Sequence, residues 1–263
     1  SGYMARAAFL MDRSMHVLGL HGKSFIPMLM GFGCNVPAVM AARTLESPED
    51  RLITIMITPL MSCTARLPVY ILFTGVFFSR NAAWVIFSIY ALGVILAVVS
   101  GKLFRRVFFP KSVSPFVMEL PPYRMPTLKG TVIHVWERTS LFLSKAGTVV
   151  LAASVVIWAL GSFPWGVKFG GTNSLVGHLG RWIEPIVRPL GLDWRAAVAL
   201  FFGLGAKEVV VSTLGVLFGS DLAGPGGKGL HGALSRSFTP LTSFTFMILS
   251  LIYIPCIATI ATI

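Results

Sequence analysis

Hydrophobic residues gather into six long runs separated by short polar stretches. The runs cover residues 24–42, 52–78, 82–101, 146–165, 196–219 and 241–263. A helix needs roughly 20 residues to cross a hydrocarbon core about 30 Å thick, and each run is close to that length or longer. The pattern therefore predicts an all-α fold, a polytopic transmembrane domain with about six apolar segments.

Two of the runs are uninterrupted. Residues 82–101 and 146–165 hold no charged side chain and no proline before Pro164. Each can close its backbone hydrogen bonds internally, as a lipid environment requires. We expect these two runs to form scaffold helices.

The other four runs carry helix-breaking residues in their interiors. Proline removes an amide donor and glycine lets the chain leave helical geometry. Irregular backbone at membrane depth is tolerated only where protein buries it or where it lines a wet cavity, and paired broken segments point to a transporter's binding site. The breaks include Pro27, Gly31, Gly33, Pro37, Pro59, Pro68, Gly203, Gly205 and Pro255.

The breaks recur in a degenerate repeat. Residues 31–35 (GFGCN) match residues 203–207 (GLGAK), and each string is followed by a second broken run that holds a cysteine, Cys63 or Cys256. The pattern predicts two halves whose broken segments meet at a central site.

Positive charge is concentrated between the two halves. The chain has 22 Lys and Arg against 10 Asp and Glu, but only 12% of its residues are charged, about half the usual share of a soluble domain. Eight of the cations lie in residues 102–145, so the positive-inside rule predicts a cytoplasmic connection there, with an amphipathic helix in its second part. The charge therefore indicates membrane orientation and requires no nucleic acid.

The predicted domains follow from this arrangement. Residues 1–101 form the first half, 102–145 the basic cytoplasmic connection and 146–263 the second half. If every run crosses once, residues 43–51 and 220–240 lie in the cytoplasm, and residues 79–81 and 166–195 lie outside. The alternative is that some of the broken runs are re-entrant.

All three cysteines, Cys34, Cys63 and Cys256, stand at helix breaks inside broken runs. Borderline transition-metal ions accept thiolate, imidazole and carboxylate ligands, whereas Mg²⁺ and Ca²⁺ require oxygen. The three thiols are therefore candidate ligands for a borderline metal ion. The alternative for each is a small apolar packing residue.

Three charged residues lie within the runs: Arg66, Lys207 and Glu208. A charge at the bilayer centre costs at least ~2.5 kcal/mol, so each needs a partner or water. Glu208 is a candidate metal carboxylate, or alternatively forms an internal ion pair with Lys207 or Arg66. Arg66 and Lys207 are expected to act as structural counter-charges or as donors to carbonyls at the breaks. Asn35 could offer its amide oxygen to the metal or cap a broken helix.

Four strings closely resemble the membrane domain of the bacterial FeoB ferrous-iron transporters. They are GFGCNVP at 31–37, SCTARLPVY at 62–70, FVMELP at 116–121 and AKE at 206–208. The likeness covers essentially the whole chain. It implies two gate-type repeats in the bacterial inner membrane that import Fe²⁺ under the control of an N-terminal GTPase domain, which this fragment is expected to lack.

The P-loop pattern that binds nucleotide phosphates is not matched. Gly22-Lys23-Ser24 has Val17 where the first glycine should stand. We therefore expect no enzyme activity from this chain, Fe²⁺ as transported substrate, and GTP with Mg²⁺ only in the missing domain. The resemblance implies as partners the lipid bilayer, the protein's own GTPase domain and small cytoplasmic Feo accessory proteins, with a homo-oligomer as a further candidate.

Two other functions remain open from the sequence. The gate-type fold also resembles membrane proteins that handle nucleoside-like solutes, which would use aromatic and amide side chains in place of three thiols. A non-transporting scaffold or redox partner would tolerate changes at the cysteines without an effect on metal movement.

Overall fold

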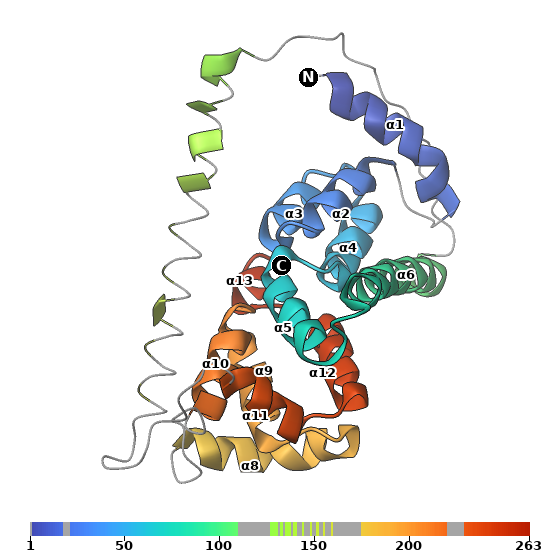
Figure 1. The fold of residues 1–263 in the computed structure, drawn as a ribbon. Coiled ribbons are helices and arrows are strands. Elements are labelled where there is room, and N and C mark those ends of the chain that lie inside the picture. The colour runs from blue at the N-terminus through green and yellow to red at the C-terminus, as the bar shows by residue number, and fades with distance from the viewer. Residues whose placement is uncertain are drawn as a thin grey trace. The chain divides into compact units, whose positions relative to one another are not determined.

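The computed structural model describes residues 2–17, 22–109, 175–219 and 229–263, together with 127–130 and scattered positions between 132 and 159. Every regular element in these ranges is a helix (Figure 1), which confirms the all-α prediction. The predicted scaffold helix 146–165 and most of the basic connection lie outside the described residues.

Three described helices are long and apolar enough to cross a membrane. They are Pro48–Phe77, Ala82–Phe108 and Pro240–Ile260, and they correspond to the second, third and sixth runs. The apolar helix Trp194–Gly203 has only ten residues. The first and fifth runs therefore do not form long spans.

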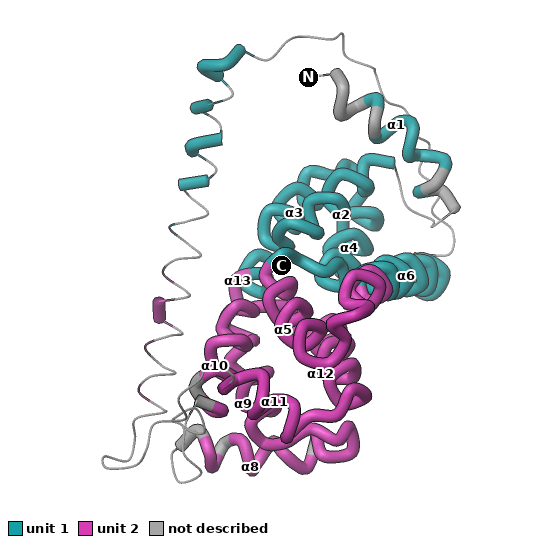
Figure 2. Tube along the Cα trace, in the orientation of Figure 1, with its two compact units in different colours: residues 1–64, 90–146, 259–263 teal, residues 65–89, 147–258 magenta. Residues whose placement is uncertain are grey.

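The chain divides into two compact units (Figure 2). Unit 1 holds residues 1–64, 90–146 and 259–263, and unit 2 holds residues 65–89 and 147–258. The domain boundaries proposed from the sequence stay a prediction.

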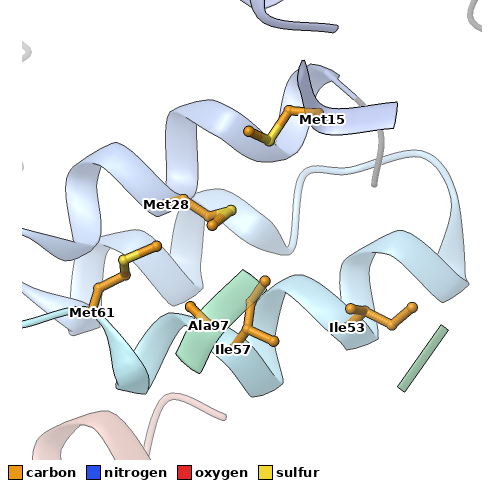
Figure 3. Packing of buried hydrophobic residues seen from close by; sticks show 6 residues of the cluster. All are labelled: Met15, Met28, Ile53, Ile57, Met61 and Ala97. Atoms are coloured by element: carbon orange, nitrogen blue, oxygen red, sulfur yellow. The ribbon is translucent and has the colours of Figure 1, made fainter. Parts of the chain in front are cut away.

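Unit 1 is built around a core of methionine and aliphatic side chains. Met15, Met28, Ile53, Ile57, Met61 and Ala97 form this core (Figure 3). Ser47 accepts a hydrogen bond from the Asp50 amide and so caps α4, which begins with proline. The helices of unit 1 are α1 Gly2–Val17, η1 Gly22–Ser24, α2 Phe25–Gly31, α3 Asn35–Ala42, α4 Pro48–Ile57, η2 Thr58–Leu60, the start of η3 Thr64–Arg66, and most of α6 Ala82–Phe108.

Helices α2 and α3 form a hairpin. They have seven and eight residues, so at 1.5 Å per residue each spans well under half of the bilayer core. Lys23, before α2, pairs with Glu46, after α3, at 2.8 Å between Nζ and Oε1. Both ends of the hairpin therefore lie close together, as in a re-entrant segment, because the chain turns back at Gly31–Gly33. The single crossing of residues 24–42 stays a conditional prediction.

Unit 2 packs around aromatic side chains. The Phe73 ring lies 5.2 Å from the Phe238 ring and 4.9 Å from the Phe246 ring, measured between centroids. Thr239 and Thr242 cap the start of α12 reciprocally through their side chains. The helices of unit 2 are α5 Leu67–Phe77, α8 Leu175–Val187, η4 Arg188–Leu190, α9 Trp194–Gly203, α10 Val209–Gly219, α11 Gly229–Ser237, α12 Pro240–Ile252 and the start of α13 Ile257–Ile260.

Helices α9 and α10 form a second hairpin. The guanidinium carbon of Arg195, at the start of α9, lies 4.8 Å from the ring centroid of Phe218, near the end of α10. The two ends of the run 196–219 therefore lie together, again as in a re-entrant segment, and its single crossing also stays a conditional prediction.

Two glycine positions show which segments are neighbours in unit 2. A Cβ at Gly75, in the last turns of α5, would lie 4.0 Å from His231, and a Cβ at Gly191 would lie 2.9 Å from Thr242. Parts of the segments 166–195 and 220–240 therefore lie with neighbours at the same end of unit 2. The conditional scheme that assigns 220–240 and 79–81 to opposite sides of the membrane stays a prediction.

Candidate functional site

Each cysteine directly precedes the first residue of a helix. Cys34 is the N-cap of α3 in an extended conformation, Cys63 precedes η3, and Cys256 precedes α13. Cys63 is buried, whereas Cys34 and Cys256 are half-buried. The helix breaks therefore place all three thiols beside irregular backbone.

In unit 1, the α2–α3 hairpin interlocks with the loop Met61–Thr64; we call this arrangement the first broken pair. Thr64 donates to the Gly33 carbonyl from its amide at 3.2 Å and from its hydroxyl at 2.8 Å. Gly33 precedes Cys34 and Thr64 follows Cys63, so these bonds bring the two cysteine-containing loops together. At Gly31 the absence of a side chain permits this approach, because a Cβ there would lie 3.2 Å from the Met61 Cβ.

Asn35 stands next to Cys34 and is 5% exposed. Its Oδ1 is buried and has no hydrogen-bond partner among the described residues. This oxygen lies 3.6 Å from the position that a Cβ would take at Gly31. A buried acceptor without a partner costs about 1–3 kcal/mol, so the site favours a bound cation or water at this oxygen.

In unit 2, the α9–α10 hairpin interlocks with the loop Tyr253–Ile257; we call this arrangement the second broken pair. The Ile257 amide donates to the Leu204 carbonyl at 2.7 Å. A Cβ at Gly203 would lie 2.5 Å from both the Tyr253 hydroxyl oxygen and Val210 Cγ2. The glycine therefore permits the close approach of the Cys256 loop.

Lys207 is 3% exposed inside the second broken pair. Its Nζ donates to the Ile254 carbonyl at 2.8 Å and lies 3.2 Å from the centroid of the Tyr253 ring. Such a cation above an aromatic face is stabilised by the ring quadrupole. The ammonium thus supports the backbone two residues before Cys256.

The other two charged candidates differ in their environment. Glu208 is exposed and forms no ion pair with any residue that the structure describes. Arg66 is 1% exposed at the end of η3, where it precedes α5. In the described ranges the structure therefore gives no ion pair of Glu208 with either Lys207 or Arg66.

The predicted metal-site residues divide between the two units. Unit 1 holds Cys34, Asn35 and Cys63, whereas unit 2 holds Glu208 and Cys256. Within the described part of the chain, no group of three His, Cys, Asp or Glu residues could hold a metal ion. The convergence of all five residues on one ion stays a prediction.

Sequence reasoning did not assign a role to Thr64 or Tyr253, whose contacts hold the hairpin and the second loop together in the first and the second broken pair. Tyr253 is the only tyrosine in the run 241–263, and a lone polar aromatic beside a helix break is the signal that could have identified it. Thr64 carries no comparable signal, because its role depends on the carbonyl of a residue 31 positions away.

Two family models match the chain. The Gate model, described as nucleoside recognition, matches residues 1–77 and 143–263, and FeoB_C, described as the ferrous iron transport protein B C terminus, matches residues 86–138. The chain belongs to the FeoB family, as its C-terminal membrane region. These family matches include no GTPase domain.

Several FeoB relatives align with the whole chain. The Fe(2+) transporter FeoB of Methanocaldococcus jannaschii is 46% identical and that of Staphylococcus aureus strain COL is 45% identical. An Fe(2+) transport protein A/Fe(2+) transporter FeoB fusion protein of Porphyromonas gingivalis is 42% identical. Each alignment covers 100% of this chain but only 40%, 39% and 36% of these relatives, respectively. No solved structure matches the chain.

Proposed function

We propose that this FeoB membrane region carries Fe²⁺ across a bacterial inner membrane. The observation that carries the proposal is the first broken pair, in which two thiols and a buried amide oxygen stand in interlocked loops. The relatives with whole-chain similarity are named as Fe(2+) transporters, which supports iron as the cargo.

Iron meets different donors in the two units. In unit 1, Cys34 and Cys63 supply soft sulfur and Asn35 supplies an oxygen. In unit 2, Cys256 supplies sulfur. The exposed Glu208 attracts the cation or takes up a proton that is coupled to its transport. Mixed sulfur and oxygen ligands suit a borderline ion, and each thiol releases its proton when it binds metal.

The two broken pairs are the members of a degenerate repeat. In each, a residue directly after a cysteine donates its amide to a carbonyl in the hairpin's break, as Thr64 does to Gly33 and Ile257 does to Leu204. In each, the first glycine of the matched strings contacts the second broken segment. Two such pairs at membrane depth fit a transporter with irregular backbone at its pathway.

The membrane topology follows from one crossing helix. The positive-inside rule assigns the basic connection after α6 to the cytoplasm, so the start of α6 and the preceding residues 79–81 lie outside. The Arg105–Asp50 ion pair, at 2.6 Å between Nη1 and Oδ1, supports a cytoplasmic position for the start of α4. His231 of α11 lies next to Gly75 near the end of α5, which supports an outer position for α11. The contact of Gly191 with Thr242 supports the same side for the end of α8 and the start of α12.

Further parts of the transport system lie outside the aligned region. The relatives are more than twice as long as this chain, and we propose that an N-terminal GTPase domain, with GTP and Mg²⁺, controls the iron pathway. The transport protein A/FeoB fusion supports small Feo accessory proteins as partners. A homo-oligomer stays a further proposal.

A nucleoside-like solute is the second candidate cargo, because the Gate model carries the description nucleoside recognition. A nucleoside requires stacking and amide contacts and makes no use of thiolates. Replacement of the cysteines by serine therefore separates the two candidates.

The test is radiolabelled Fe²⁺ uptake by the full-length transporter with Cys34→Ser, Cys63→Ser or Glu208→Gln. We expect each cysteine variant to lower the initial rate about tenfold, which corresponds to ~1.4 kcal/mol of lost stabilisation, and Glu208→Gln to lower it less. Mn²⁺, Zn²⁺ and adenosine serve as competitors.

Two variants act as matched controls. Ala206→Ser places a hydroxyl at the second-pair position that matches Cys34, and Glu184→Gln removes a half-buried carboxylate of α8. Both should preserve uptake. Unchanged uptake in all three test variants contradicts the proposed iron site, and competition by adenosine favours the nucleoside.

A further inference from the structure

Helix α8 (Leu175–Val187) has one face fixed against its own unit. Gly177, Gly180 and Val187 are buried. A Cβ at Gly180 would lie 2.7 Å from Val198 Cγ2 and 3.0 Å from Trp194 Cε3, both on α9. Because this approach needs a glycine, α8 can present only its opposite face to the surroundings.

That opposite face carries cations and a large aromatic ring. His178, Arg181, Trp182, Pro185 and Arg188 are exposed, with 79% of Trp182 accessible. At 3.6 residues per turn the four positions within α8 fall within an arc of about 100°, and Arg188 begins η4 directly after the helix. The described positions therefore form an exposed stripe along α8 and into the start of η4.

The two edges of this stripe differ in character. Trp182 forms one edge, whereas Arg181 and Arg188 form the other. The half-buried Glu184 lies beyond the cationic edge and is the acid of this helix, so the stripe keeps a net positive charge. An apolar edge parallel to a cationic edge is the arrangement of helices that lie in a membrane interface.

The C-terminal end of α8 lies close to the first turn of a candidate membrane span. Gly191 follows η4 with φ +72°, a left-handed conformation that suits glycine, and a Cβ there would lie 2.9 Å from Thr242 Cγ2. Thr242 is in the first turn of α12, where the candidate span Pro240–Ile260 begins. Figure 1 shows α8 across this end of unit 2, below α9 and α11.

We propose that the exposed stripe of α8 binds the headgroups of anionic phospholipids in the outer leaflet. The Trp182 indole lies at the boundary between headgroups and acyl chains, where tryptophan is favoured. Arg181 and Arg188 bind lipid phosphates through their guanidinium forks. The contact with the span's first turn favours a bilayer as occupant over a free anion, because only a bilayer also covers the tryptophan edge.

The proposal rests on the membrane topology proposed above and not on the cargo of the transporter. The test uses the full-length transporter in nanodiscs of phosphatidylcholine, with or without phosphatidylglycerol, whose acyl chains carry bromine near the headgroup. The difference between wild type and Trp182→Phe isolates the fluorescence of Trp182. We expect phosphatidylglycerol to increase the bromine quenching of Trp182 and high salt to reverse the increase.

Substitutions identify the arginines as the binding groups. Arg181→Gln with Arg188→Gln should raise the phosphatidylglycerol fraction needed for half-maximal quenching at least fivefold, because each arginine near an anionic surface contributes about that factor. Arg181→Lys with Arg188→Lys should restore most of the response. The matched control Arg236→Gln, an exposed arginine of α11, should leave it unchanged.

Three results would overturn the proposal. Trp182 could be quenched equally in both kinds of nanodisc, or the double glutamine variant could keep the wild-type response. In the third, inorganic phosphate added to phosphatidylcholine nanodiscs would reproduce the change in fluorescence, which would identify a site for free anions.

Discussion

The two broken pairs share one backbone construction and differ in the side chains at its centre. In both, a glycine admits the second broken segment and an amide after a cysteine bonds to a carbonyl in the hairpin's break. The first pair then places Cys34 and Asn35 where the second places Ala206 and Lys207. The difference lies in what the buried centre offers to a cation.

The first broken pair offers an oxygen acceptor to a cation, whereas the second broken pair already contains a cation, the Lys207 ammonium. Asn35 Oδ1 lacks a hydrogen-bond partner in the described ranges, whereas the Lys207 ammonium is bound to the Ile254 carbonyl and the Tyr253 ring. A positive charge held there repels a second one, so the first pair is better suited to receive iron. One construction can therefore provide a binding site in one unit and a structural support in the other.

The largest expected effect on stability comes from Lys207→Met. The change leaves the Ile254 carbonyl without its donor and removes the cation above Tyr253, and relief of the buried charge offsets only part of that loss. We expect the free energy of unfolding to fall by about 2–3 kcal/mol, measured by chemical unfolding in detergent.

Lys23→Met is the matched control in the first hairpin. It breaks the solvent-exposed pair with Glu46, which contributes at most about 1 kcal/mol. Equal stability of the two variants would show that Lys207 does not support the second pair.

A smaller difference is expected between the two glycines. Gly203→Ala places a Cβ 2.5 Å from the Tyr253 hydroxyl oxygen and from Val210, and the ring cannot move without disturbing its contact with Lys207. Such overpacking costs about 1–3 kcal/mol. Gly31→Ala meets the Met61 Cβ at 3.2 Å, and the higher helix propensity of alanine offsets this tighter contact. Thermal unfolding midpoints should therefore fall for Gly203→Ala and stay near wild type for Gly31→Ala; the reverse order would contradict the interlocks.

The sequence predicts the fold best where one run forms one helix. The uninterrupted run 82–101 lies within α6, because its local composition alone meets the needs of a lipid-spanning helix. The runs 24–42 and 196–219 have the length of a span but return on themselves. Their breaks show where the helix ends, whereas the direction of the chain afterwards depends on distant contacts such as Lys23 with Glu46.

The candidate site shows the same limit. Residue type and position identify Cys34, Cys63 and Lys207 as unusual, since thiols and a charge at helix breaks need an explanation. The missing partner of Asn35 Oδ1 and the ring beneath Lys207 are products of packing between segments far apart in the chain. Pattern analysis alone could not supply either feature.

The smallest expected effect on stability, and the sharpest test of the comparison, comes from Asn35→Ala. No hydrogen bond within the described structure is lost, so the free energy of unfolding should stay within about 1 kcal/mol of wild type, whereas Fe²⁺ uptake should fall several-fold. Ser250→Ala is the matched control, because the Ser250 hydroxyl is likewise buried with no partner among the residues described, but in α12 of unit 2. It should change neither stability nor uptake. Equal loss of uptake in both variants would mean that buried polar atoms act by general packing, and the first pair would lose its distinction as the cation acceptor.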